Sequence, residues 1–190
     1  MSQQRNFWMR WRVRTGYLLA VVYWLLSTPA PRSIFLGAIL ALFGLLIRGA
    51  AAGYLRKYEA LATAGPYAFT RNPLYFGSGF LALGFAIAGG SWLAGLLVLA
   101  YFAIFYYQVM RNEESDLRHR YGAVYDEYAA RVPLFFPRLA RSGSESPAVS
   151  DRSFSWPQYL RNREYKAMIG TVAGVGIVWL RMWIHGKWGF

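Results

Sequence analysis

The sequence predicts an all-α integral membrane protein with about five transmembrane helices and a cytoplasmic amphipathic helix that follows a hairpin of the third and fourth spans. Of its 190 residues, 56% are hydrophobic and only 16% are charged. Several apolar runs approach the roughly 20 residues that a membrane-spanning helix needs. The formal net charge is +12, and the basic residues flank the apolar runs, as they do at the cytoplasmic face of a membrane. This pattern favours membrane lipids over nucleic acid as the partner.

The apolar runs predict spans at residues 13–26, 33–47 (extendable to 54), 74–88, 92–110 and 166–184. Pro29 and Pro31 end the first span, and Gly89-Gly90-Ser91 forms a tight turn between the third and fourth. Most of the 21 lysines and arginines lie in residues 1–14, 48–73 and 111–166. An odd number of spans with this charge distribution predicts a cytoplasmic N-terminus.

The composition also divides the chain into three parts. Residues 1–137 form the predicted membrane core. Residues 138–165 are rich in serine, proline and charge, which is typical of a flexible linker. Residues 166–190 then form an accessory C-terminal transmembrane helix.

A polar motif at residues 65–77, Gly-Pro-Tyr-Ala-Phe-Thr-Arg-Asn-Pro-Leu-Tyr-Phe-Gly, stands between the second and third spans. We call it the collar. Pro66 and Pro73 each fix φ and restrict the residue before them. Proline is favourable at a first helical position, so a stiff irregular segment should lead into a helix that begins near Pro73.

A second polar motif follows the fourth span, at residues 111–137. Leu117, Tyr121, Val124, Tyr125 and Tyr128 recur at helical spacing, which predicts an amphipathic helix over residues 111–130. The two spans of the hairpin are antiparallel and similar in length, so the two motifs should meet at one membrane edge. The joint site would contain Tyr67, Arg71, Asn72, Tyr75, Glu113, Glu114 and Arg131.

The absence of cysteine excludes disulfides, zinc–thiolate sites and a cysteine nucleophile. The two histidines, His119 and His185, are too few for a histidine-based metal cluster. We therefore predict no metal site.

The two motifs together resemble those of the isoprenylcysteine carboxyl methyltransferase family, which is related to the phospholipid N-methyltransferases. Residues 71–77, Arg-Asn-Pro-Leu-Tyr-Phe-Gly, are similar to the family element R-[HN]-P-x-Y-x-G. The second element is represented by Glu113-Glu114, Leu117, Tyr121-Gly122, Tyr125, Tyr128, Val132-Pro133 and Pro137. Asn72 stands where many members of the family have histidine.

The resemblance implies an enzyme, a methyltransferase that binds S-adenosyl-L-methionine on the cytosolic side and modifies a lipophilic acceptor. It implies a cofactor site lined by Tyr67, Arg71, Asn72, Pro73, Tyr75, Gly77, Glu113, Glu114 and Tyr125. Tyrosine rings suit a sulfonium cation, and Arg131 is suited to orient an acceptor carboxylate through two hydrogen bonds. A carboxylate acceptor needs no general base, whereas an amine would need one, for which Glu114 and Glu127 are candidates.

Three alternatives stay open at this stage. The acceptor is a phospholipid amine instead of a carboxylate, the chain is an NADPH-dependent reductase of a sterol-type double bond, or it is a non-catalytic membrane scaffold. A reductase predicts a larger basic pocket and a longer membrane domain than 190 residues supply. A scaffold would not need proline, arginine, asparagine and glutamate gathered at matched membrane depths.

Overall fold

The computed structural model describes residues 2–56, 59–138 and 153–188, and every regular element in these ranges is a helix. The predicted all-α class is therefore confirmed for the described part of the chain. The elements in order are α1 (Ser2–Leu26), α2 (Pro31–Tyr54), the 3₁₀ helix η1 (Gly65–Ala68), α3 (Pro73–Ala88), α4 (Trp92–Tyr121), α5 (Ala123–Arg131), α6 (Trp156–Arg161) and α7 (Tyr165–Trp188).

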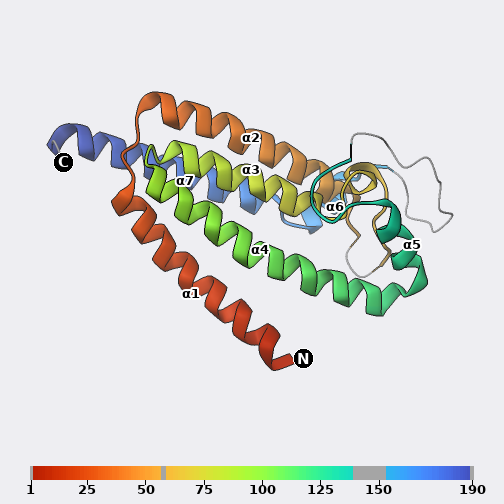
Figure 1. Ribbon diagram of the computed structural model, residues 1–190. Coiled ribbons are helices and arrows are strands. Elements are labelled where there is room, and N and C mark those ends of the chain that lie inside the picture. The colour runs from red at the N-terminus through yellow and green to blue at the C-terminus, as the bar shows by residue number, and fades with distance from the viewer. Residues whose placement is uncertain (1, 57–58, 139–152, 189–190) are drawn as a thin grey trace.

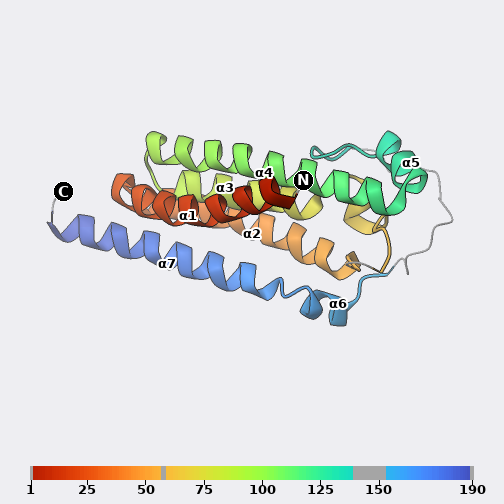
Figure 2. The same ribbon diagram turned by 90° about the horizontal axis from the view of Figure 1, so that it is seen from below.

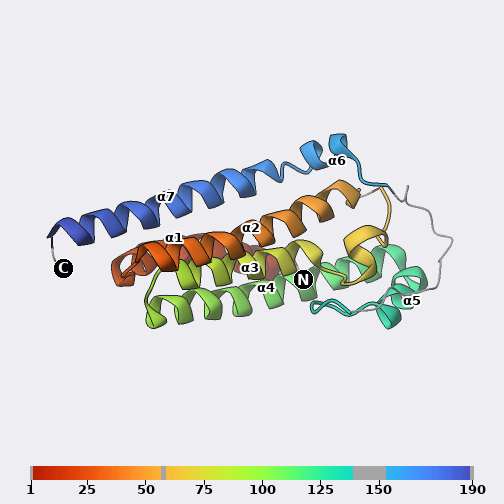
Figure 3. The same cartoon turned by 90° about the horizontal axis from the view of Figure 1, so that it is seen from above.

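The long helices form a bundle with the short ones gathered at one end. Figure 1 shows α2, α3 and α4 side by side, with α5 and α6 beyond the same end of the bundle. Helix α1 packs against α4. Figures 2 and 3 show α7 on the outer side of α2, away from α4, where it contacts both α2 and α3.

Within the described ranges, three helices are long and apolar enough to cross a membrane: Pro31–Tyr54, Trp92–Tyr121 and Tyr165–Gly186. Two other predicted spans coincide with shorter apolar helices, Arg14–Leu26 and Pro73–Ala88. At 1.5 Å per residue, the 16 residues of α3 reach about 24 Å, against a hydrocarbon core of about 30 Å. The chain is thus a membrane protein, but the count of five spans is not confirmed, and the cytoplasmic N-terminus stays a prediction.

Large apolar side chains point outward from the bundle along α2. Phe35 is 67% exposed and Leu46 is 62% exposed. A helix that turns such side chains away from its neighbours has lipid rather than water as its natural solvent. The outer faces of the bundle therefore suit contact with acyl chains.

Glycines allow the backbones of α2 and α3 to approach each other closely. A Cβ on Gly44 would lie 2.5 Å from the Gly77 carbonyl oxygen, and one on Gly84 would lie 2.6 Å from the Gly37 carbonyl oxygen. Helices in membranes associate through such small residues because dispersion contacts replace the hydrophobic drive available in water. This close packing fixes where α3 begins relative to α2.

The tight turn predicted at residues 89–91 is present between α3 and α4. Gly90 has φ +65°, a left-handed conformation that glycine adopts without steric cost. Ser91 caps α4, since its side chain accepts a hydrogen bond from the Ala94 amide at 3.4 Å.

The amphipathic stretch predicted over residues 111–130 is divided between two helices. Helix α4 continues without a break to Tyr121, so residues 111–121 extend the fourth span instead of starting a separate helix. Gly122 then adopts φ +51°, which ends α4, and α5 follows directly. The sequence pattern missed this division because the apolar spacing is helical on both sides of Gly122.

The region predicted as a flexible linker is described only in part, because residues 139–152 lie outside the described ranges. Residues 156–161 within it form α6, which packs against α2. Ser155 caps this helix, its side chain accepting from the Gln158 amide at 3.4 Å. Serine and proline at a helix start resemble a linker in composition, which is why the sequence did not separate the two.

Candidate active site

The collar adopts the stiff, irregular conformation that its prolines predict. It contains the short helix η1 and then turns into α3, with Asn72 as the residue before the helix and Pro73 at its first position. Pro73 is buried. The predicted helix start near Pro73 is thus confirmed.

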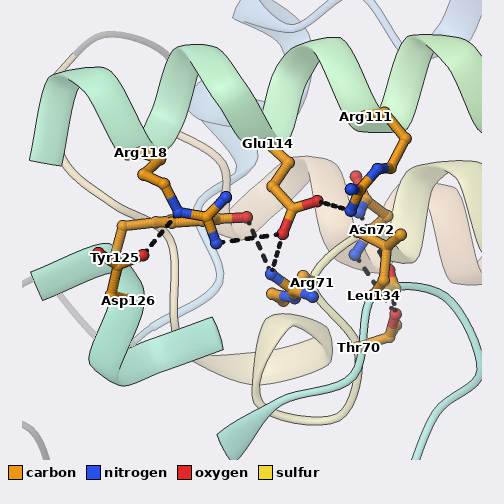
Figure 4. Close-up of polar contacts among 9 residues, drawn as sticks. All are labelled: Thr70, Arg71, Asn72, Arg111, Glu114, Arg118, Tyr125, Asp126 and Leu134. Carbon is orange, nitrogen blue, oxygen red and sulfur yellow. Dashed lines mark hydrogen bonds and ion pairs between the residues drawn. The ribbon is translucent and has the colours of Figure 1, made fainter. Parts of the chain in front are cut away.

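The segment after α5 holds the collar in place through hydrogen bonds. The Arg71 amide donates to the Pro133 carbonyl at 2.9 Å. The Asn72 side-chain amide donates to the Leu134 carbonyl at 3.0 Å, a contact visible in Figure 4. Asn72 therefore serves here as a bridge between the collar and residues 133–135, a role that needs an amide or imidazole donor but no titration.

One ion pair joins the two polar motifs. The Arg71 Nη1 atom lies 2.8 Å from Glu114 Oε1 and donates to the Tyr125 hydroxyl at 3.2 Å. The Arg71 and Glu114 side chains are only 12% and 6% exposed. Figure 4 shows Arg71 reaching up from the collar to Glu114 on α4. The hairpin of α3 and α4 thus brings together residues 43 positions apart, as the sequence predicted.

Two further arginines of α4 surround the same carboxylate. Arg111 Nη1 lies 2.6 Å from Glu114 Oε2, and Arg118 Nη2 lies 3.6 Å from Glu114 Oε1. Arg118 also pairs with Asp126 at 2.7 Å. The motifs did not single out Arg111 and Arg118, although their positions three before and four after Glu114 place them on its helix face.

Positive charge is therefore in excess around Glu114. Its two oxygens face three guanidinium groups, and charge-assisted hydrogen bonds of this kind hold a carboxylate in a fixed position. One donor is left over: the Arg71 Nε atom is buried and has no hydrogen-bond partner in the described residues. Buried donors are rarely left unpaired, so this atom has the capacity to bind a water molecule or an oxygen of a ligand.

Three tyrosines form the buried floor of the site. The Tyr128 hydroxyl donates to the Tyr67 carbonyl at 2.7 Å, and Tyr125 is only 1% exposed. Burial raises the pKa of both Tyr67 and Tyr128 well above the ordinary value for a phenol, because the phenolate would lack solvation. The nearby carboxylate of Glu113 raises the pKa of Tyr67 further. These side chains are therefore neutral donors at physiological pH.

Glu113 and Glu114 differ in their surroundings although they are adjacent in sequence. Glu113 is exposed, and within the described ranges it makes no ion pair. Glu114 is buried and fully engaged. Only Glu113 is consequently free to receive a cation from outside the protein.

Three predicted site residues lie apart from this cluster. Gly77 faces α2, where an added Cβ would lie 2.7 Å from the Gly44 carbonyl oxygen. Tyr75 packs its ring edge-to-face on Tyr106, with centroids 5.6 Å apart. Arg131 pairs with Glu127 of its own helix.

The ring of Tyr125 is also already occupied. The guanidinium carbons of Arg71 and Arg118 lie 5.9 and 5.7 Å from its centroid. Protein cations thus occupy the position that the sequence analysis assigned to a sulfonium.

Residues 32–124 match the phospholipid methyltransferase family. The nickel-cobalt-cadmium resistance protein NccN of Alcaligenes xylosoxydans xylosoxydans is 43% identical over 93 residues, which cover 48% of this chain and 42% of NccN. The cobalt-zinc-cadmium resistance protein CzcN of Cupriavidus metallidurans is 41% identical with the same coverage. In the described ranges no group of three or more histidine, aspartate or glutamate side chains is placed to hold a metal.

A protein-S-isoprenylcysteine O-methyltransferase of Schizosaccharomyces pombe is 27% identical over 129 residues, 65% of this chain and 55% of the relative. The chain thus spans about half the length of the curated relatives it matches. No solved structure matches it. The family match runs from α2 through the collar and the α3–α4 hairpin, the elements that carry Arg71 and Glu114. The chain is therefore a membrane protein whose central region matches the phospholipid methyltransferase family and which is similar over 129 residues to an isoprenylcysteine O-methyltransferase.

Proposed function

We propose that this protein is an S-adenosyl-L-methionine-dependent methyltransferase that acts on a lipophilic acceptor reaching the site from the bilayer. The observation that carries the proposal is the buried Arg71–Glu114 pair, which joins the collar to the second polar motif at one end of the bundle. Structural ion pairs at a membrane edge are costly to desolvate and often mark functional sites. The family match of residues 32–124 supplies the reaction class.

The residues present suit the cofactor. The unpaired Arg71 Nε atom is a donor for the cofactor's carboxylate, and the exposed Glu113 is an acceptor for its ammonium or ribose hydroxyls. Tyr67, Asn72 and Pro73 would complete the wall on the collar side. Bound there, the cofactor supplies an electrophilic methyl group, and the protein's task is to hold donor and acceptor in line.

The ion pairs of Glu114 favour a carboxylate as the acceptor. Both Glu114 oxygens are engaged by arginines, so this side chain is placed to position Arg71 and not to remove a proton. A carboxylate attacks the methyl group without a general base, whereas an ammonium acceptor must first lose a proton. A phospholipid amine is consequently the second choice.

Arg131 is our candidate for orienting the acceptor carboxylate. Replacing it by alanine is expected to lower kcat/KM for the acceptor roughly 10- to 100-fold, because a charge-assisted hydrogen bond contributes about 1.5–3 kcal/mol. Cofactor affinity, measured by calorimetry, should stay unchanged. Arg161→Ala, on the exposed face of α6, is the matched control. Equal loss of cofactor affinity and turnover in the Arg131 variant would place this arginine on the cofactor side.

The proposed activity is tested in two steps with the full chain in detergent or lipid. Calorimetry should detect micromolar-range binding of S-adenosylmethionine or its demethylated product, and no binding would refute the proposal. Transfer of labelled methyl to a total membrane extract then identifies the acceptor. A product hydrolysed by mild base is an ester and indicates a carboxylate, and a stable product indicates nitrogen.

A further inference from the structure

A second, partly buried ion pair lies outside the cluster around Glu114 and links the C-terminal part of the chain to α2. Arg48 donates from Nε and Nη2 to Glu164 Oε2, at 3.1 and 2.7 Å. The two side chains are 18% and 13% exposed. Arg48 lies in an apolar, candidate membrane-spanning helix, where an arginine is costly and is found paired and with a function.

The remaining nitrogen of Arg48 contacts the first two turns of α3. Its Nη1 atom donates to the Ser78 hydroxyl at 2.5 Å and to the Leu74 carbonyl at 3.3 Å. Ser78 in turn donates to Leu74 at 3.0 Å. Leu74 follows Pro73 directly, so the guanidinium group is bound to the turn in which the collar ends.

The segment before Glu164 is fastened to the end of α2. The Asn162 side-chain amide donates to the Ala52 and Leu55 carbonyls, both at 2.8 Å. Gln158 also donates to Leu55, at 3.0 Å. The Ala52 carbonyl also accepts from the Leu55 amide at 3.4 Å. Carbonyls at the end of a helix lack the full set of intrahelical partners, so these side chains cap α2.

The backbone just before Glu164 is strained. Arg163 has φ +56° and is the one residue other than glycine with positive φ among those described. A residue with a Cβ adopts this conformation at a cost of about 1 kcal/mol, so its neighbours must enforce it. The turn connects α6 to α7 and presents Glu164 to Arg48.

We propose that Arg48 and Glu164 are a positioning pair, which fixes the first turn of α3 and thereby the cofactor side of the collar. Glu164, with Asn162 that fastens its segment to α2, then contributes to the site from outside the hairpin. The inference rests on the proposed methyltransferase function. It assigns a role to Glu164, which lies outside the region that matches the phospholipid methyltransferase family.

The test compares Glu164→Gln with Glu59→Gln in the full chain. Glu59 pairs with Arg161, which lies three residues before Glu164, at 2.8 Å. The Glu59 and Arg161 side chains are 48% and 69% exposed, so this exposed pair is the matched control. Glu164→Gln is expected to raise the dissociation constant and the KM for S-adenosylmethionine about tenfold or more, with a smaller change in kcat. Glu59→Gln should stay within about twofold of wild type.

A second variant and a ligand-free measurement cover the case in which Glu164→Gln does not fold. Ser78→Ala removes a contact of Arg48 with α3 and keeps the ion pair; it should weaken cofactor binding in the same direction. Because the chain has no cysteine, spin labels can be placed at Phe69 in the collar and Leu96 on α4. Glu164→Gln or Ser78→Ala should broaden the distance distribution between them, and Glu59→Gln should not.

The outcomes separate the two proposals. A wild-type chain that neither binds the cofactor nor transfers methyl refutes the proposed function. A wild-type chain that does both, with Glu164→Gln and Ser78→Ala indistinguishable from Glu59→Gln in affinity and label distance, overturns the positioning role.

Discussion

Replacing Glu114 by alanine is expected to lower the free energy of unfolding by about 3–5 kcal/mol and to abolish methyl transfer. The change leaves the buried Arg71 guanidinium with the Tyr125 hydroxyl as its remaining side-chain partner, and an uncompensated buried charge has a cost of this size. Thermal or denaturant unfolding in detergent measures the first effect. Labelled-methyl transfer measures the second.

Replacing Arg71 by alanine should lower the free energy of unfolding by less than Glu114→Ala does. In Arg71→Ala the Glu114 carboxylate keeps Arg111 and Arg118, so the loss of stability should be smaller although transfer is lost as well. Arg111→Ala is the control, because this side chain is 52% exposed and an exposed pair contributes about 0–1 kcal/mol. If Arg71→Ala destabilised the protein more than Glu114→Ala, Glu114 would not be the centre of the network.

Replacing Gly77 by alanine is expected to destabilise the protein by about 1–3 kcal/mol, the usual cost of overpacking. The added Cβ would lie 2.7 Å from the Gly44 carbonyl oxygen and 2.7 Å from the Arg48 Cγ atom. The carbonyl belongs to the backbone of α2, so the two helices must separate. The unfolding midpoint of the cofactor-free protein measures the effect.

This variant also separates two roles for Gly77. As a packing residue, its replacement lowers stability before any ligand is added. As a residue that lines the cofactor pocket, its replacement would leave the unfolding midpoint unchanged and weaken cofactor binding. Gly176→Ala is the control, since nothing lies within 4 Å of the added Cβ and alanine favours the helix.

The sequence was sufficient for much of the fold and for the meeting of the two motifs. Apolar runs of nearly fixed length predicted the long helices, because the bilayer imposes that length on any spanning helix. Pro73 marked the start of α3, since its ring suits the first helical position. A short turn at Gly90 makes α3 and α4 antiparallel, so Arg71 and Glu114 had to lie at one end.

Local patterns were less informative where two elements have the same periodicity or composition. The break at Gly122 was missed because the apolar spacing continues through it, and α6 was hidden in a stretch that reads as a linker. Arg111 and Arg118 were overlooked as partners of Glu114 although helical spacing places them beside it. Here the pattern was present, but it is equally typical of a solvated helix face.

By itself the sequence determined the membrane class, the order of the helices and the pairing of the collar with the second motif, because all three follow from hydrophobicity and short connections. Only the tertiary structure decided that Glu114 is enclosed by three arginines, that Gly77 faces α2, and that Arg48 meets Glu164 across 116 positions. Long-range contacts between side chains depend on how helices rotate and pack against one another. That rotation is set by many small packing contacts between side chains, and no single sequence motif predicts their sum.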